Sequence, residues 1–334
     1  MYRRILPRAL LALVMCAALA TPAQAAPSLA EVQAKVQLLE EEATTAAEGA
    51  QEAKVKLAVL TRTLNGIKAK AAVQGQTLSA LQKSLGTIAV EQYKAGGMGQ
   101  SLELLFSSNP SLYLSSAGAL DAISRRKSVQ LRTYQAAQQR LNATTLTVND
   151  KMALVAAAEK KFKAQSAMAQ TKLAQAEALL SKLTKAERER LAKLAAAQED
   201  ADQVSSQAAA RALSGVSGRA GIAIKFALKQ IGDRYVFGAA GLVTWDCSGL
   251  TMRAYQAAGV SLPHSSAAQS RMGKKVSLKA LKPGDLLFFG HPVSHVGMYI
   301  GGGKMVHAPR SGSRVKVTSS GSLGSKPLVG ARRF

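Results

Sequence analysis

Cysteine is scarce in this 334-residue chain, which contains only Cys16 and Cys247. Cys16 lies in a segment typical of a secretory signal peptide, residues 1–25, with a basic start, a short apolar run and Ala23-Gln24-Ala25 at its end. An uncleaved anchor and lipid attachment at Cys16 fit this segment less well, because the apolar run is short for a bilayer. Removal of the segment leaves Cys247 as the only thiol and excludes an intrachain disulfide. A lone thiol is vulnerable to oxidation outside the cell, so its retention indicates a chemical role.

Histidine and acidic residues are also unevenly distributed. The first 263 residues contain no histidine, and all four histidines, at positions 264, 291, 295 and 307, follow them. From residue 218 onward the formal charge is 17 − 3 = +14, against 24 − 17 = +7 for residues 26–217. Such a field favours anionic partners, and for an exported chain we expect anionic cell-envelope polymers and no nucleic acid. Solubility alone is the simplest alternative.

Residues 26–200 are predicted to form a coiled-coil rod. Seam residues recur alternately every four and three positions over residues 32–88: Val32, Val36, Leu39, Ala43, Ala46, Ala50, Ala53, Leu57, Leu60, Leu64, Ile67, Ala71, Gln74, Leu78, Leu81, Leu85 and Ile88. Glycines at 96, 97 and 99 and the pair Asn109-Pro110 indicate a reversal with short helices around it.

A second long helix is expected to start near Leu120. Its predicted seam includes Leu141, Val148, Met152, Val155, Phe162, Leu173, Leu180, Leu183 and Leu194. We expect the two helices to fold back as an antiparallel hairpin. A parallel homodimer without a fold-back is the alternative.

Residues 201–217 are rich in small and polar residues and are predicted to end the helix and form a short linker. The remaining residues, 218–334, have a different pattern. Two segments indicate helices, 220–231 and 247–258, and five indicate strands: 285–289, 295–300, 304–307, 315–318 and 328–334. Helices followed by a sheet predict a small α+β domain, so the whole chain is assigned to the α+β class.

Cys247 stands at the start of the predicted helix 247–258. Free N–H groups and the helix dipole at such a position favour a thiolate, and the same N–H groups can bind an oxyanion. His295 and His307 lie on segments joined by three glycines, and a hairpin would place them on neighbouring strands. Whether they share a face depends on register, which stays open. If they do, one imidazole can act on the thiol while the other orients it.

The other polar residues of the region have more than one interpretation. His291 and His295 have a spacing that could supply half of a zinc site, but acidic ligands are few and we expect no metal. His264 is either a wall of a pocket or a turn residue. Trp245 is expected to pack beside the helix that begins at Cys247.

The segment from Gly221 to Phe334 resembles the NlpC/P60 domain of cell-wall peptidases, a reduced papain-like fold. The motifs that carry the resemblance are Tyr235-Val-Phe-Gly238, Asp246-Cys-Ser-Gly249, Pro263-His-Ser-Ser-Ala-Ala-Gln269, Lys282-Pro-Gly-Asp-Leu-Leu-Phe288, Ser294-His-Val-Gly-Met-Tyr-Ile-Gly301 and Met305-Val-His-Ala308. Their order and spacing match over nearly the whole domain. Phe237 and His264 stand where many members have Trp and Arg, which leaves fine specificity open.

The resemblance implies a cysteine peptidase without a cofactor, acting on peptidoglycan stem peptides. Cys247 would be the nucleophile, His295 the base and His307 the third polar residue. Tyr235 would contact the substrate or intermediate. The remaining implied residues, Asp246 and Ser248, would help to bind the stem peptide. The bond would be the one between γ-D-glutamate and a diamino acid, commonly meso-diaminopimelate.

The rod resembles the coiled-coil regions of actinobacterial division-associated wall hydrolases. This resemblance implies a secreted, cell-wall location and a membrane-embedded division regulator that acts on the rod. Because the linker is short, the rod would also be close enough to block the active site. Two other classes of function stay open: a metal-dependent amidase, which a chelator would inhibit, and a non-enzymatic envelope scaffold, which alkylation of Cys247 would leave unaffected.

Overall fold

The computed structural model describes residues 28–94, 110–211 and 215–334. The predicted signal peptide lies outside these residues, as does the predicted reversal before Pro110. None of the described helices is both long enough and apolar enough to cross a membrane.

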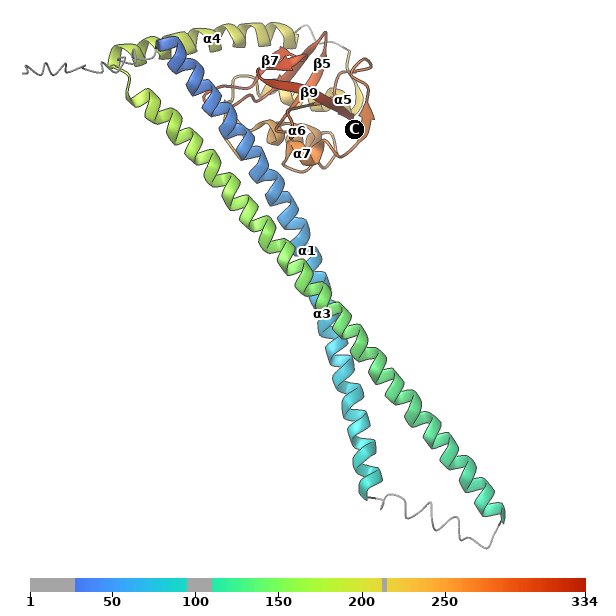
Figure 1. Cartoon of the computed structure of the whole chain (residues 1–334). Helices are drawn as coiled ribbons and strands as arrows, with labels where there is room; N and C mark the ends of the chain where they lie inside the picture. Colours follow the sequence, from blue (N-terminus) through green and yellow to red (C-terminus); the bar gives the residue numbers. More distant parts are fainter. Residues whose placement is uncertain (1–27, 95–109, 212–214) are drawn as a thin grey trace, which may run out of the picture.

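Two long helices, α1 (Leu29–Lys94) and α3 (Pro110–Ser181), form the predicted antiparallel hairpin within one chain. With 66 and 72 residues they measure about 100 and 110 Å at 1.5 Å per residue. They pack closely, cross, and then diverge at the end far from the C-terminal domain (Figure 1). α3 begins at Pro110 rather than near Leu120, and proline is favoured at a first helical position because its missing N–H has no intrahelical partner there.

The predicted seam of α1 is confirmed, because all of its residues are buried or half-buried. The seam of the second helix was wrong at two places: Met152 and Leu194 are 47% and 51% exposed. The predicted seam steps by four residues from Val148 to Met152. In the structure the next half-buried position after Val148 is Lys151, three residues on, so Met152 points to solvent. Leu194 lies beyond a break in the helix, where the helical phase is reset.

The break corrects the prediction of one continuous second helix. α3 ends at Ser181, and a separate helix, α4 (Lys185–Arg211), begins after a short turn. Thr184 and Glu187 cap α4 reciprocally: Thr184 donates from its N and Oγ1 to Glu187 Oε2, both at 2.8 Å, and Glu187 N donates to Thr184 Oγ1 at 3.3 Å. This capping box is readable in the sequence and predicts a helix start at this point. Residues 201–211, assigned to the linker, form the last part of α4.

The C-terminal domain contains three helices and two sheets, and most of the strands follow the helices in the sequence. The helices are α5 (Gly218–Lys229), α6 (Cys247–Ala257) and α7 (Ser266–Gln269). The strands are β1 (Arg234–Tyr235), β2 (Thr244–Trp245), β3 (Lys274–Val276), β4 (Leu286–Phe289), β5 (His295–Gly301), β6 (Lys304–His307), β7 (Lys316–Ser319), β8 (Ser322–Leu323) and β9 (Lys326–Arg333). The two helices and five strands expected from the sequence are confirmed. The short elements β1, β2, β3, β8 and α7 were missed because two to four residues show no periodicity.

The larger sheet has the order β3-β9-β4-β5-β6-β7, all antiparallel, with β8 pairing β9. Helices α5 and α6 pack on one of its faces, where Leu250, Phe288, Val296 and Met298 are part of a single buried cluster. Trp245 packs in the same cluster, as predicted, and its Nε1 donates to Asp233 at 2.8 Å.

Helix α4 covers the outer edge of this sheet at β7 (Figure 1). Val317 N donates to Ser206 Oγ at 2.8 Å, and Gln203 Nε2 donates to the carbonyl oxygen of Val315 at 3.3 Å. The ion pair between Lys316 and Asp202, at 2.6 Å, lies beside them. The Ser206 hydroxyl therefore accepts a hydrogen bond from a backbone N–H at the sheet edge, to which another strand could otherwise pair. These contacts join the C-terminal domain to α4.

Candidate active site

Cys247 is the first residue of α6, as the sequence predicted. Asp246 is the N-cap, and its Oδ1 accepts a hydrogen bond from Gly249 N at 2.6 Å. Gly249 is required by the close approach of the chain, because a Cβ there would lie 2.3 Å from the carbonyl oxygen of Ala239. The thiol is fully buried. The local fold therefore places the sulfur at a helix N-terminus, where unpaired N–H groups gather.

His295 and His307 lie on neighbouring strands, β5 and β6, and their rings are in contact. His295 Nε2 and His307 Nδ1 are 2.9 Å apart, and Thr318 Oγ1 is 3.3 Å from His307 Nε2. The register that the sequence left open therefore brings the two imidazoles together. His295 Nδ1 is buried and has no hydrogen bond within the described residues. It is the ring nitrogen of His295 that no hydrogen bond from these residues occupies.

Burial favours the neutral form of both imidazoles, because it lowers the pKa of each. Burial lowers the pKa of His295 well below its ordinary value, and the charge of His307 acts in the same direction. Burial lowers the pKa of His307 to about 3. A neutral His295 is the form that can act as a base.

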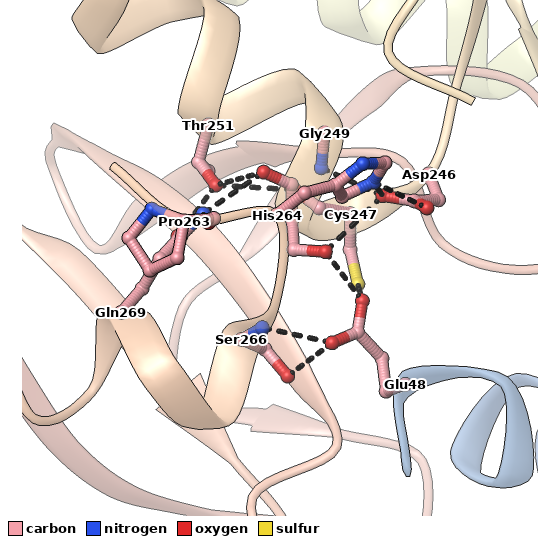
Figure 2. Close-up of polar contacts among 10 residues, drawn as sticks. Glu48, Asp246, Cys247, Gly249, Thr251, Pro263, His264, Ser266 and Gln269 are labelled. Carbon is pink, nitrogen blue, oxygen red and sulfur yellow. Dashed lines mark hydrogen bonds and ion pairs between the residues drawn. The ribbon is translucent and has the colours of Figure 1, made fainter. Parts of the chain in front are cut away.

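A carboxylate from the rod occupies the space in front of the thiol. Glu48 of α1 is buried and accepts four hydrogen bonds (Figure 2). Its Oε1 accepts from Cys247 Sγ at 3.1 Å and from Ser248 Oγ at 2.7 Å. Its Oε2 accepts from Ser266 N at 2.8 Å and from Ser266 Oγ at 2.7 Å. A carboxylate can accept about four hydrogen bonds, so the site satisfies Glu48 fully, as it would a bound carboxylate ligand.

The bound carboxylate changes the chemistry of Cys247. Burial raises the pKa of the thiol well above its ordinary value, and the charges of Glu48 and Asp246 raise it further, while the backbone N–H of Val296 acts in the opposite direction. The thiol is therefore protonated, and it donates its hydrogen to Glu48. This arrangement, with Glu48 hydrogen-bonded to Cys247, is called the closed arrangement below.

The sequence of α1 explains how Glu48 reaches the site. Between residues 43 and 53 one face carries small seam residues toward α3, including Ala46 and Ala50. Another face carries Thr44, Glu48 and Gln51, buried at i, i+4 and i+7 spacing. Because α3 covers the first face and the C-terminal domain the second, this segment is buried nearly all round.

Ion pairs flank the contact on both sides. Glu40 pairs with Arg310 at 3.1 Å, and Glu52 pairs with Arg271 at 3.0 Å. The row of acids on α1 therefore runs along cations of the C-terminal domain. The role of Glu48 was missed from the sequence, where only a general block of the active site by the rod was expected.

Comparison with known proteins agrees with this geometry. The NlpC/P60 family pattern matches residues 232–333. This C-terminal region belongs to the NlpC/P60 family. Its members include cysteine peptidases.

The matched relatives are named as peptidases. A "Probable endopeptidase" of Mycobacterium tuberculosis is 44% identical over 120 residues, which are 36% of this chain and 31% of that protein. The gamma-D-glutamyl-L-lysine dipeptidyl-peptidase of Bacillus subtilis is 37% identical over 109 residues, 31% of this chain and 37% of that protein. The peptidoglycan endopeptidase RipA of Mycolicibacterium smegmatis is 36% identical over 120 residues, 32% of this chain and 24% of that protein. The chain therefore spans between about a quarter and two fifths of the length of these relatives, and each similarity covers about a third of this chain.

The other predicted residues of the NlpC/P60 domain lie around the thiol. The hydroxyl of Tyr235 is buried and has no hydrogen bond within the described residues. Burial, and after it the charge of Cys247, raises the pKa of Tyr235 well above its ordinary value, so the hydroxyl stays a donor. Ser248 faces Glu48, whereas the carboxylate of Asp246 is engaged by Gly249 N and by His264 Nε2 at 2.8 Å. His264 is thus a wall of the site and not only a turn residue.

Two further polar residues hold the site together and were not singled out from the sequence. Ser266, at the start of α7, binds Glu48 through its backbone and its hydroxyl. Gln269 donates to the carbonyl oxygens of Ser248 and Pro263 at 2.9 Å and accepts from Thr251 at 2.8 Å. Both residues stand in the motif Pro263-His-Ser-Ser-Ala-Ala-Gln269, which was the available signal.

The zinc hypothesis finds no support in the geometry. His291 is exposed, whereas His295 is buried against His307. Over the residues that the structure describes, no group of three histidine, cysteine or acidic side chains is arranged to hold a metal ion.

Proposed function

We propose that this protein is a peptidoglycan endopeptidase that cleaves stem peptides by thiol chemistry. The observation that carries the proposal is Cys247 at the N-terminus of α6, in an NlpC/P60 domain whose buried His295–His307 pair leaves one ring nitrogen free. The substrate class follows the names of the relatives, which act on peptidoglycan or on a γ-D-glutamyl peptide. The bond is that between γ-D-glutamate and a diamino acid, with meso-diaminopimelate as the expected residue.

The mechanism is acyl transfer through a thioester. His295 Nδ1 removes the proton of the Cys247 thiol, and the sulfur attacks the carbonyl carbon of the scissile amide. The oxyanion accepts hydrogen bonds from the backbone N–H of Cys247 and from the hydroxyl of Tyr235. The carbon–nitrogen bond then breaks, and the imidazolium of His295 gives its proton to the leaving amine. Water attacks the thioester, with His295 again as base, and releases the acid and the thiol.

His307 acts through His295. Its Nδ1 contacts His295 Nε2 at 2.9 Å and holds the ring so that Nδ1 of His295 stays free. Ser248 and Asp246 complete the wall of the substrate site, Ser248 by direct contact and Asp246 by fixing His264 and the start of α6.

The rod regulates this activity by closing the site. Glu48 occupies the position in front of the thiol and takes the hydrogen that His295 would remove. Hydrolysis therefore requires movement of α1 away from Cys247. A membrane-embedded division regulator that binds the rod would supply this movement, and the basic C-terminal domain would keep the secreted enzyme on anionic polymers of the wall.

The test uses the full-length chain in a form in which the site is open. Glu48→Ala and Glu48→Ala/Cys247→Ala chains are incubated with purified peptidoglycan, and the released fragments are identified by mass spectrometry. We expect stem-peptide fragments cut beside the diamino acid from the first chain and none from the second. Equal release by the two chains would rule out thiol catalysis.

A further inference from the structure

A lysine near the active site, Lys326, has no ion-pair partner among the residues that the structure describes. Lys326 begins β9, directly after the turn that joins it to β8, and its side chain is partly buried. Among the described residues it makes no ion pair within 4.0 Å, although the basic residues on either side of the site, Arg310 and Arg271, are both paired with α1. An unpaired ammonium that loses part of its water is unfavourable unless an anion binds it at some stage.

The strand register places Lys326 on the same face of the sheet as the base, two strands away from it. His295 of β5 pairs with Phe289 of β4, and Phe289 pairs with Leu328 of β9, so these three residues share a face of the sheet. Lys326 precedes Leu328 by two residues and is therefore on that same face, about 7 Å further along the strand. Burial lowers the pKa of Lys326, whereas the charges of Glu41 and Glu48 act to raise it. Burial also lowers the pKa of His295, and the charges of His307 and then Lys326 act in the same direction.

The inhibitory helix presents carboxylates to the same place. Glu41 accepts a hydrogen bond from Ser325 Oγ at 3.3 Å, in the turn next to Lys326, and its charge also acts on this lysine. Glu48, two turns further along α1, fills the position at the thiol. In the closed arrangement the rod thus imitates an anionic substrate, with one carboxylate at the nucleophile and another near Lys326.

The position of Lys326 on the sheet face of His295 indicates which half of the substrate it meets. His295 must give its proton to the leaving amine, so the amine-bearing residue lies against His295. We propose, resting on the function proposed above, that Lys326 binds a free carboxylate of the leaving diamino acid and selects such peptides over amidated or carboxylate-free ones. Lys326 is thus a residue that determines specificity on the leaving side and takes no part in the bond changes.

The experiment compares three stem peptides in the full-length Glu48→Ala chain. Their leaving residue carries a free side-chain carboxylate, the corresponding carboxamide, or no such group. We expect the free carboxylate to be preferred at least about tenfold in kcat/KM, mainly through KM, since one charge-assisted hydrogen bond contributes about 1.5–3 kcal/mol. Lys326→Met in this background should remove the preference, Lys326→Arg should keep most of it, and Lys304→Met, at an exposed lysine, should leave it intact.

Binding provides a second readout that does not require turnover. Affinities of the same peptides for a Glu48→Ala/Cys247→Ala chain, measured by calorimetry, should show the same preference and the same loss with Lys326→Met. A preference that survives Lys326→Met, or no preference in the parent chain, would overturn the proposal. The proposal would also be overturned if Lys326→Met changed the pH dependence of Cys247 alkylation but left the preference for the free carboxylate unchanged, because Lys326 would then act on the thiol. Absence of cleavage with the preference retained in binding would count against the endopeptidase function alone.

Discussion

The two ends of α1 differ in what surrounds them. At the near end, residues 43–53 are enclosed by α3 on one face and by the NlpC/P60 domain on another, and Ala50 is completely buried. At the far end the seam is only half-buried, the helices diverge, and Tyr93 is 87% exposed. The difference indicates that closure of the active site depends on a short segment near Glu48. Most of the rod extends the molecule and adds little to its stability. A force or partner at the far end would therefore meet little packing resistance before it reaches this segment.

The largest effect is expected from Glu48 itself. Replacing it with Ala or Gln in the full-length chain should raise peptidoglycan hydrolysis about tenfold or more, a shift of ~1.4 kcal/mol or more in the closed–open equilibrium. Gln cannot maintain the closed arrangement either, because its amide nitrogen would face either the thiol or Ser266, both of which are hydrogen-bond donors. The measurement is the rate of fragment release.

The matched control is Glu91→Ala, at an exposed acid near the far end of α1. We expect it to leave the rate unchanged. Equal rates for wild type, Glu48→Ala and Glu91→Ala would show that Glu48 does not restrain the enzyme.

Core packing should show the same contrast in stability. Leu39 is 4% exposed and packs with Val36 and Ala176, so Leu39→Ala should destabilise the hairpin by about 2–4 kcal/mol. Leu85 is a half-buried seam residue at the far end, and Leu85→Ala should reduce the stability of the hairpin by clearly less. Thermal unfolding followed by the helical circular dichroism signal gives both values. Similar losses at the two sites would contradict the difference in packing.

The closed arrangement should weaken as pH rises. Burial, and next the charge of Asp246, raises the pKa of Glu48 above its ordinary 4.5. A carboxyl whose pKa is raised on closure holds its proton more tightly in the closed arrangement, so closure is favoured as pH falls toward 4.5 and is weakened as pH rises through the raised value. His264 has the same sign: burial alone would lower its pKa, but Asp246 and Glu48 raise it. The charge of Glu48 also acts to raise the pKa of Cys247, Tyr235 and Lys326.

The rate of Glu48→Gln divided by that of wild type, measured at each pH, isolates this effect because the titration of the catalytic groups largely cancels. We expect the ratio to be highest on the acidic side and to fall as pH rises. A ratio that does not vary with pH would show that titration of Glu48 is not linked to closure.

The smallest effect is expected at the turn between α3 and α4, next to the near end of the rod. Thr184→Ala removes the cap of α4 and should cost about 1 kcal/mol of helix stability. Thr145→Ala, at an exposed position within α3, provides the matched control. If the two variants unfold alike, the cap does not stabilise the turn.

The sequence predicted the parts of the site that depend on local structure. Cys247 could be placed at a helix start because the residues that follow it have a helical pattern. The strands of His295 and His307 were predicted from alternation and glycine turns. The ring contact between them was not, because three glycines leave the register open and only the packed sheet selects one pairing. The break at Thr184 was missed although its capping box is local.

What the sequence by itself determined is local: a cysteine at a helix start, histidines on the strands that follow, and a helical hairpin, which periodicity and turn signals predict. The role of His295 as base is what the family resemblance implies. What only the tertiary structure decided is the state of the thiol. Glu48 lies 199 residues before Cys247, and in the sequence it is one acid among many on a helix. Only the docking of α1 against α6 and α7 gives it four donors, because burial, and not residue type, turns an ordinary surface acid into a bound carboxylate.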